Sequence, residues 1–378
     1  IRPPAGGLAR GLTELAPGES WLVPPRVGVE GNPHLVAPGV KWGVAAGGLM
    51  HGTEFFGPLL GVMAADDLPH AIDLVRATGY GLTSGLESLD EREQTLWREA
   101  APAGNLYINR PTTGAIVRRQ PFGGMGKSNV GPGLKAGGPN YVAQLMSFDA
   151  ESASDATRRV TSPSRADDRV AAFCDRLAGE LGHAGSQRLR DAAASYAAAF
   201  RKEFACERDP SRLLGEDNFH RYRPAGVVRV RLSAGDTLLN AAMRVAAAGV
   251  IGSRVVLSAD RSDVDSNVVK QLTNAMRPWV DGKELSIESD DELADRIRHG
   301  EQQPAGQTER VWYAGPDRVP EVVRRAAAEQ LAWIADRAPT GCGRLDLLWL
   351  VQEQTVSHVY HRYGNLGRRS EEPRAPVR

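Results

Sequence analysis

The sequence predicts an α/β protein built from two α/β units, and three observations support this fold class. Short apolar runs typical of strands alternate with helical stretches between residues 59 and 109, and again between 226 and 351. Residues 149–167 between them are small, polar and aperiodic, which is typical of a linker. Glycine makes up 41 of the 378 residues and lies mostly in the first 140, where tight turns are expected.

The first unit follows a loop-like stretch of about fifty residues that is rich in proline and glycine. Its first helix should stop at Gly79, and Ser88 with Glu91 has the spacing of a capping box that opens the second helix. The expected elements are strand Leu59–Ala64, helix Leu68–Ala77, strand Tyr80–Glu87, helix Leu89–Ala100 and strand Gly104–Asn109.

The second unit should begin with two helices and continue as strands alternating with helices. That alternation is typical of a parallel, doubly wound sheet. The expected helices are Asp168–Gly182, Ser186–Phe204, Leu238–Ala248, Asp263–Met276, Asp290–His299 and Val319–Arg337. The expected strands are Gly226–Leu232, Arg254–Ser258, Glu284–Glu288, Glu309–Ala314 and Leu345–Val351.

Charge and cysteine content exclude several classes of protein. Lys+Arg and Asp+Glu both number 46, so no basic field indicates a nucleic-acid partner within this segment. No apolar run reaches the roughly 18 residues of a membrane span, which leaves at most a peripheral membrane association. Cys174, Cys206 and Cys342 form no paired motif, and the N-terminal residues have no signal-peptide pattern. These features favour a cytoplasmic protein.

Two stretches carry the chemistry of the first unit: Glu54–Pro58, which reads E-F-F-G-P, and Gln120–Ser128, which reads Q-P-F-G-G-M-G-K-S. The second is not a phosphate-binding P-loop, because Pro121 stands where the pattern G-x-x-x-x-G-K-S needs glycine. It also fails the dinucleotide pattern G-x-G-x-x-G, because Asn129 occupies the last position.

Together these stretches resemble the C-terminal signature of the aldehyde dehydrogenase superfamily. YGLTSGLESLDEREQ, AGNLYINRPTTGAIVRRQPFGGMGKS and GPGLKAGGPNYV resemble the glutamate-γ-semialdehyde (pyrroline-5-carboxylate) dehydrogenase branch, above all the bifunctional proline utilization A proteins of bacteria. VSHVYHRYGNLG resembles the C-terminal motif of those proteins. The resemblance implies the C-terminal part of an aldehyde dehydrogenase fold, followed by a degenerate aldehyde-dehydrogenase-like doubly wound α/β domain.

The resemblance also implies roles for particular residues. Glu54 matches the glutamate that accepts hydrogen bonds from the ribose hydroxyls of NAD, and Phe56 matches the aromatic residue beside that ribose. Gly114 and Ala115 match the loop whose backbone N–H groups bind the substrate's α-carboxylate. Phe122 matches the aromatic residue that packs on the substrate's aliphatic chain. Outside the motif, Glu54 alone would be a solvated acid and Phe122 a packed side chain.

Other features of the family have no match in this sequence. No cysteine stands in the context of the catalytic cysteine, so no catalytic residue is assigned and the chain alone should be inert. FAD would belong only to a proline dehydrogenase domain outside this sequence. Because the chain starts at Ile1 and its first methionine is Met50, we expect a fragment or a processed product, and the resemblance implies that it is the C-terminal part of a larger protein. His358 and His361 lack a third ligand nearby, so no metal site is predicted.

The predicted organisation has four parts. Residues 1–148 are the dehydrogenase part, 149–167 the linker, 168–355 the accessory domain and 356–378 a tail motif. The accessory domain should not bind NAD, because Ser258 to Asp260 stand where the family has a lysine after the second strand. Two functions follow as alternatives. One is part of an NAD-dependent glutamate-γ-semialdehyde dehydrogenase, with a small-molecule substrate and a homo-oligomeric parent; the other is a non-catalytic lid or assembly protein.

Overall fold

The structure of the chain is a computed structural model that describes residues 2–148, 168–277, 285–299, 309–361 and 364–372. The chain divides into two compact units. Unit 1 comprises Ile1–Tyr80 and Asp90–Ala101, and unit 2 comprises Gly81–Leu89 and Pro102–Arg378. The predicted linker 149–167 and parts of the predicted tail lie outside the described residues.

Unit 1 contains a three-stranded sheet in the order β1-β4-β5. β1 is antiparallel to β4, and β5 is parallel to it. The strands are β1 (Ser20–Val23), β4 (Gly39–Trp42) and β5 (Leu59–Val62), and the helices are α1 (Gly6–Thr13), α2 (Leu49–Gly52), α3 (Leu68–Ala77) and α4 (Glu91–Ala100). Shorter elements are β2 (Arg26–Val27), β3 (Val36–Ala37) and a 3₁₀ turn at Val29–Gly31. β6 (Tyr80–Gly81) spans the point in the chain where unit 1 ends and unit 2 begins.

The sequence predicts the bounds of α3 correctly but not the cap of α4. α3 has the predicted bounds, and the Asp67 side chain accepts a hydrogen bond from the His70 N–H at 2.8 Å. The predicted capping box of Ser88 and Glu91 is wrong. Asp90 caps α4 by accepting from the Arg92 N–H at 2.8 Å. The Ser88 N–H instead donates to Asn109 Oδ1 at 2.9 Å, within unit 2.

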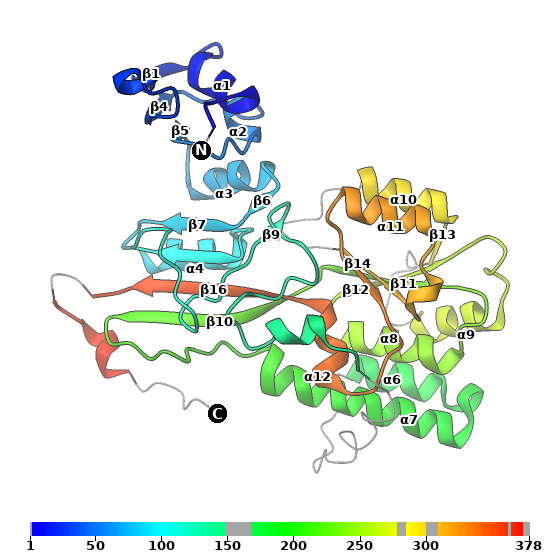
Figure 1. Cartoon of the computed structure of the whole chain (residues 1–378). Coiled ribbons are helices and arrows are strands. Elements are labelled where there is room, and N and C mark those ends of the chain that lie inside the picture. Colours follow the sequence, from blue (N-terminus) through cyan, green and yellow to red (C-terminus); the bar gives the residue numbers. More distant parts are fainter. Residues whose placement is uncertain (1, 149–167, 278–284, 300–308, 362–363, 373–378) are drawn as a thin grey trace. The chain divides into compact units, whose positions relative to one another are not determined.

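Unit 2 contains a four-stranded mixed sheet in the order β10-β16-β8-β7. β16 is parallel to β8, with Thr355 opposite Asn105, and antiparallel to β10, with Glu353 opposite Tyr222. Figure 1 shows β16 (orange-red) running alongside β10 (green). The strands are β7 (Thr83–Leu86), β8 (Asn105–Ile108), β10 (Glu216–Pro224) and β16 (Val351–Val359). Segments more than 240 residues apart in the chain are therefore paired as neighbouring strands. The Thr355 side chain also donates a hydrogen bond to the Asn105 side chain.

A second sheet in unit 2 has five parallel strands in the order β13-β12-β11-β14-β15. Figure 1 shows α8 and α9 on one face of it and α10 and α11 on the other, which is the predicted doubly wound arrangement. The strands are β11 (Val227–Leu232), β12 (Arg254–Ala259), β13 (Leu285–Ile287), β14 (Glu309–Tyr313) and β15 (Ile334–Asp336). The helices are α8 (Leu238–Val250), α9 (Asn267–Met276), α10 (Asp290–His299) and α11 (Glu321–Glu329).

Among the remaining helices of unit 2, α6 and α7 pack against α8, and α12 packs against α7. α7 packs against both α6 and α8, and its side chains Leu189 and Tyr196 are fully enclosed in the core of this unit. These elements are α6 (Asp168–Arg176), α7 (Ala178–Ala199), a π turn at Phe200–Phe204, α12 (Gly343–Asp346), and 3₁₀ turns at Tyr141–Leu145, Pro316–Arg318, Leu347–Leu350 and Arg368–Glu371; β9 is the short strand Met125–Gly126.

The structure of unit 2 departs from the sequence predictions at several elements. The stretch Leu345–Val351 is helical up to Leu350, and the strand begins only at Val351. The predicted helix Val319–Arg337 ends at Glu329, and its last residues form β15. β10 was not predicted as a strand at all. Among the described residues, no helix is both long enough and apolar enough to cross a membrane.

Buried polar side chains connect the mixed sheet to the rest of unit 2, and Glu353 on β16 is the most highly connected of them. It is 1% exposed. Its carboxylate accepts from the Lys135 backbone N–H at 2.7 Å and from Asn140 Nδ2 at 2.6 Å, and it lies 3.6 Å from His220 Nε2. A buried carboxylate is stable only when donors of this kind replace its hydration shell.

We predict that Glu353→Ala lowers the free energy of unfolding by about 3 kcal/mol, because it leaves buried donors without an acceptor. Urea unfolding followed by circular dichroism measures the change. Glu321→Ala, at an exposed position on α11, is the matched control and should change stability by less than about 1 kcal/mol. Equal effects of the two substitutions would contradict the prediction.

Candidate functional site

The Glu54–Pro58 turn is positioned in unit 1 by its contacts with α1. It leads directly into β5, and the Phe55 ring lies against Gly11. A Cβ atom at Gly11 would lie 2.7 Å from Phe55 Cε1, and one at Gly57 would lie 2.6 Å from Leu8 Cδ1. A side chain at either position would therefore have to displace Phe55 or Leu8 for the turn to lie this close to α1.

Phe56 and Glu54 alternate with Phe55 and point away from this contact. Phe56 is 94% exposed and has a φ of 51°, which is uncommon for a residue other than glycine. Glu54 is exposed as well. A positive φ at a bulky residue is a reason to expect a functional constraint. The turn thus presents a carboxylate and a ring that can contact a ligand.

The loop of Gly114 and Ala115 lies in unit 2, and residues 111–118 are all exposed. Gly114 has a φ of 78°, and a Cβ atom there would meet nothing within 4 Å. The requirement for glycine is therefore conformational rather than steric. Exposed backbone N–H groups next to a left-handed residue are suited to binding an anion.

The sequence analysis missed Gln120, which fixes the second half of this loop. Gln120 is 2% exposed, and its Oε1 accepts from the Ile116 N–H at 3.0 Å. Its Nε2 donates to Asn218 Oδ1 at 2.5 Å and to Glu216 Oε1 at 3.1 Å, both on β10. The side chain thus links the loop to the mixed sheet. No pattern in the sequence identifies a glutamine in this role.

Arg110 fixes the other end of the loop to the same carboxylate. Its Nη1 donates to Glu216 Oε1 at 2.7 Å and to Ser357 Oγ on β16 at 2.7 Å. The loop between Arg110 and Gln120 is therefore attached at both ends to Glu216. An exposed loop held in this way can keep a defined backbone conformation without a core of its own.

Phe122 follows this loop, and its backbone is fixed. Its N–H donates to the Ala136 carbonyl at 2.9 Å, and its carbonyl accepts from the Ala136 N–H at 3.0 Å. The side chain is 38% exposed, so it is only partly packed within unit 2. The structure thus places Gly114, Ala115 and Phe122 on one connected loop segment of unit 2, whereas Glu54 and Phe56 lie in unit 1.

The side chain of Lys135 is hydrogen-bonded to the backbone of Gly123, the residue that follows Phe122. The side chain is 1% exposed, and Nζ donates to the Gly123 carbonyl at 2.5 Å and to Asn105 Oδ1 at 3.0 Å. Burial lowers the pKa of Lys135 to about 7, and the charge of Glu353 opposes that shift. This amine is therefore a buried group that titrates near neutral pH.

Comparison with known proteins identifies the segment that carries these motifs. The sequence model of the aldehyde dehydrogenase family matches residues 11–150. The chain contains an aldehyde dehydrogenase family domain. The bifunctional protein PutA of Rhizobium meliloti is 50% identical over 95 residues, which are 25% of this chain and 8% of that protein. The 1-pyrroline-5-carboxylate dehydrogenase of Bacillus subtilis is 34% identical over 143 residues, which are 38% of this chain and 27% of that protein.

The structural comparison extends beyond the aldehyde dehydrogenase domain. The structure of proline utilization A from Corynebacterium freiburgense aligns with 96% of this chain at 35% identity and a TM-score of 0.70. The aligned part is 31% of that protein, so the chain spans less than a third of its length. The resemblance stated from the motifs is thus confirmed, and it covers the second, doubly wound sheet as well as the aldehyde dehydrogenase domain.

The second sheet carries buried charges where a dinucleotide would bind in a doubly wound fold. That place is the crevice at the carboxyl ends of the strands where the strand order reverses, here between β11 and β14. Arg244 is fully enclosed there. It donates to the carbonyls of Arg231 and Trp312, each at 2.9 Å, and to Asp236 Oδ2 at 2.7 Å.

Ser258 is the first of the three residues that stand in place of the family's lysine, and its side chain is likewise hydrogen-bonded within the second sheet. Ser258 Oγ donates to Glu288 Oε1 at 2.7 Å and accepts from Arg231 Nη1 at 2.9 Å. No group of three or more His, Cys, Asp or Glu side chains suited to a metal ion occurs within the described part of the chain.

We predict that Lys135 makes folding stability rise with pH. The unfolded chain keeps a proton on this amine up to its ordinary pKa of 10.5, whereas the folded chain releases it near pH 7. The unfolded state therefore binds more protons between about pH 7 and 10.5, and the free energy of unfolding increases across that window.

Lys135→Met should remove this contribution. Urea unfolding at about pH 6.5 and about pH 9.5 measures the pH dependence, which should be smaller in the variant than in the parent. Lys270→Met, at an exposed lysine, is the matched control and should keep the parental pH dependence. An unchanged pH dependence in Lys135→Met would show that the amine stays charged in the folded state.

Proposed function

We propose that this chain is the C-terminal part of an NAD-dependent L-glutamate-γ-semialdehyde (1-pyrroline-5-carboxylate) dehydrogenase within a bifunctional protein of proline breakdown. The observation that carries the proposal is the structural match to proline utilization A over 96% of the chain. The sequence likeness to PutA of Rhizobium meliloti and to the dehydrogenase of Bacillus subtilis supports it.

NAD, when bound, accepts the hydride from the substrate. Glu54 would accept hydrogen bonds from its ribose hydroxyls, because an ionised carboxylate has two oxygens that only accept. Phe56 would lie beside the same ribose. Their exposure and the left-handed backbone at Phe56 fit such a contact, because both groups are free to meet a ligand.

The α-carboxylate of the substrate would bind the backbone N–H groups of Gly114 and Ala115. The exposed loop and the φ of Gly114 support this role. Phe122, partly exposed on the same segment, would pack against the aliphatic chain of the substrate. The loop ends held by Arg110 and Gln120 would keep the backbone donors in place before the substrate arrives, which lowers the cost of binding.

The reactive thiolate would come from outside the residues of this chain. Burial raises the pKa of the Cys174 thiol to about 12, so this side chain stays protonated at neutral pH. Cys206 Sγ donates to the Arg201 carbonyl at 3.2 Å, and Cys342 precedes α12. None of these cysteines belongs to the segments that carry the family motifs.

A second candidate function is a structural one, in which the accessory part supports the dehydrogenase without reacting itself. The pairing of β16 with β8 favours it, because it completes the sheet next to the Gly114 loop. The Arg244–Asp236 pair in the crevice of the second sheet also supports it. The two candidates are compatible within one longer protein.

We predict that the isolated chain forms no NADH from glutamate-γ-semialdehyde and NAD⁺, because the covalent route needs a thiolate nucleophile. Absorbance at the NADH band measures the reaction. If turnover does occur, it should be compared with that of Cys174→Ser, Cys206→Ser and Cys342→Ser. Loss of turnover in one of them would identify a nucleophile within this chain and contradict the proposal.

In the full-length enzyme, Gly114→Val should lower kcat/KM for glutamate-γ-semialdehyde by about tenfold or more, because valine disfavours the left-handed backbone that aims the N–H donors. Kinetics with pentanal, which lacks the carboxylate, should change much less. Gly114→Asn is the matched control, since asparagine tolerates this conformation and should retain more activity. Equal losses on both aldehydes would rule out a carboxylate-binding loop.

A further inference from the structure

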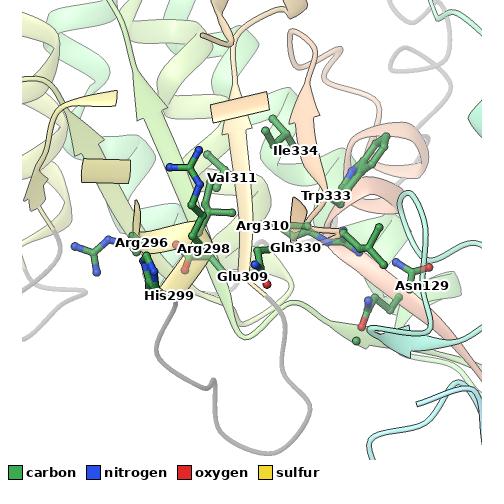
Figure 2. A pocket seen from close by; sticks show the side chains of 15 residues that line it. Asn129, Arg296, Arg298, His299, Glu309, Arg310, Val311, Gln330, Trp333 and Ile334 are labelled. Carbon is green, nitrogen blue, oxygen red and sulfur yellow. The ribbon is translucent and has the colours of Figure 1, made fainter. Parts of the chain in front are cut away.

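A cavity of about 400 Å³ lies in unit 2, and the residues that line it do not include those of the Gly114 loop. It opens at the amino ends of β14 and β15, opposite the crevice at the carboxyl ends of the strands that Arg244 occupies. Its wall combines the last turn of α10, the residues that follow α11, and Asn129 of the aldehyde dehydrogenase domain (Figure 2). Gln352, at the start of β16, also lines it.

Arg310 on β14 is the unusual residue of this wall. It is 2% exposed, and its Nη2 donates to the Pro132 carbonyl at 2.7 Å. Its Nε is fully enclosed without an acceptor in the described part of the chain. Nη1 also has no acceptor among these residues but is not enclosed, so it is the nitrogen that is open to the cavity.

No carboxylate of the described residues compensates the charge of Arg310. Burial alone lowers its pKa to about 10, with no opposing contribution from an acid. The acids nearby are already paired: Glu309 with Arg229 at 2.5 Å, and Glu329 with Arg298 at 2.8 Å. A buried guanidinium without an anionic partner is costly, and it is uncommon unless a ligand supplies the partner.

Gln352 is a second buried polar group at this cavity. It is 4% exposed, and its side-chain amide has no hydrogen-bond partner among the described residues. Since its amide atoms are not enclosed either, they are available to a ligand as a donor and an acceptor. Two polar side chains, each more than nine-tenths buried, thus face the same cavity, Arg310 without a carboxylate and the Gln352 amide without a hydrogen-bond partner in the described part of the chain.

The rest of the wall sets the size and character of a ligand. Trp333, Val311 and Ile334 provide apolar surface next to the polar groups (Figure 2). A volume of about 400 Å³ is at the lower end of small-molecule sites. An inorganic oxyanion would leave most of this space and its apolar wall unused, whereas a compact organic acid would contact both.

We propose that this cavity binds a small organic carboxylate, held by Arg310 Nη1 and the Gln352 amide, with its apolar body against Trp333 and Val311. The carboxylate supplies the negative charge that the enclosed guanidinium lacks. The apolar wall then favours an acid with a hydrophobic body over a small inorganic anion. The ligand would contact both the aldehyde dehydrogenase domain, through Asn129, and the second sheet.

Three probes of matched size or charge test the proposal on the full chain by isothermal titration calorimetry and ligand-observed NMR. Benzoate has the carboxylate and an apolar ring, benzamide has the same shape without the charge, and inorganic phosphate has the charge without the ring. We expect benzoate to saturate one site per chain and to bind about tenfold more tightly than either of the others.

Variants assign the binding to the cavity. Arg310→Met should weaken benzoate binding by about tenfold or more and should raise Tm without ligand, since an unpaired buried charge is replaced by an apolar chain of similar length. Gln352→Leu should weaken binding by several-fold, and it serves as the second test if Arg310→Met does not fold. Arg261→Gln removes a charge at an exposed position and is the matched control, with no expected effect on binding.

Each other outcome contradicts the proposal. Absence of saturable benzoate binding, or equal binding in Arg310→Met and the parent, would show that the cavity is not a carboxylate site. Phosphate binding as tight as benzoate binding would show a simple oxyanion site. A lower Tm for Arg310→Met with benzoate binding unchanged would show that the guanidinium serves only the Pro132 contact.

Discussion

The insertion of β16 between β8 and β10 determines how the rest of unit 2 is built. A strand buried among other elements normally carries apolar side chains, because each buried polar group needs a partner. β16 instead carries Gln352, Glu353, Gln354, Thr355 and Ser357, all nearly inaccessible. The last four have partners on other elements, several of them from the aldehyde dehydrogenase domain. The strand therefore fits only one register and only one set of neighbours.

This arrangement makes the geometry of the Gly114 loop depend on residues far away in the sequence. Arg110 and Gln120 belong to the aldehyde dehydrogenase domain, but the side chains that hold them, Glu216 and Ser357, come from β10 and β16. β10 and β16 therefore contribute the hydrogen bonds that hold the two ends of this loop. The cavity at Arg310 is likewise lined by residues of the aldehyde dehydrogenase domain and of the second sheet.

The sequence predicted the elements whose signals are local. α8 begins after the Thr237 cap, and the alternation of buried strands with helices identified the parallel sheet. β10 and β16 were missed as strands because their burial does not show in their polarity: HRYR and VQEQTVSHV contain too few apolar residues to display a buried face. Gln120 and Arg310 were missed for a related reason, since only the tertiary structure shows that these polar side chains are enclosed.

The position of β16 also has a consequence for synthesis of the protein on the ribosome. β8 emerges about 250 residues before the strand that pairs with it in parallel, so the edge of β8 stays unpaired while most of the chain is being translated. At about 5–20 residues per second, that interval is on the order of tens of seconds. An open strand edge of this kind can pair with other chains until β16 is in place.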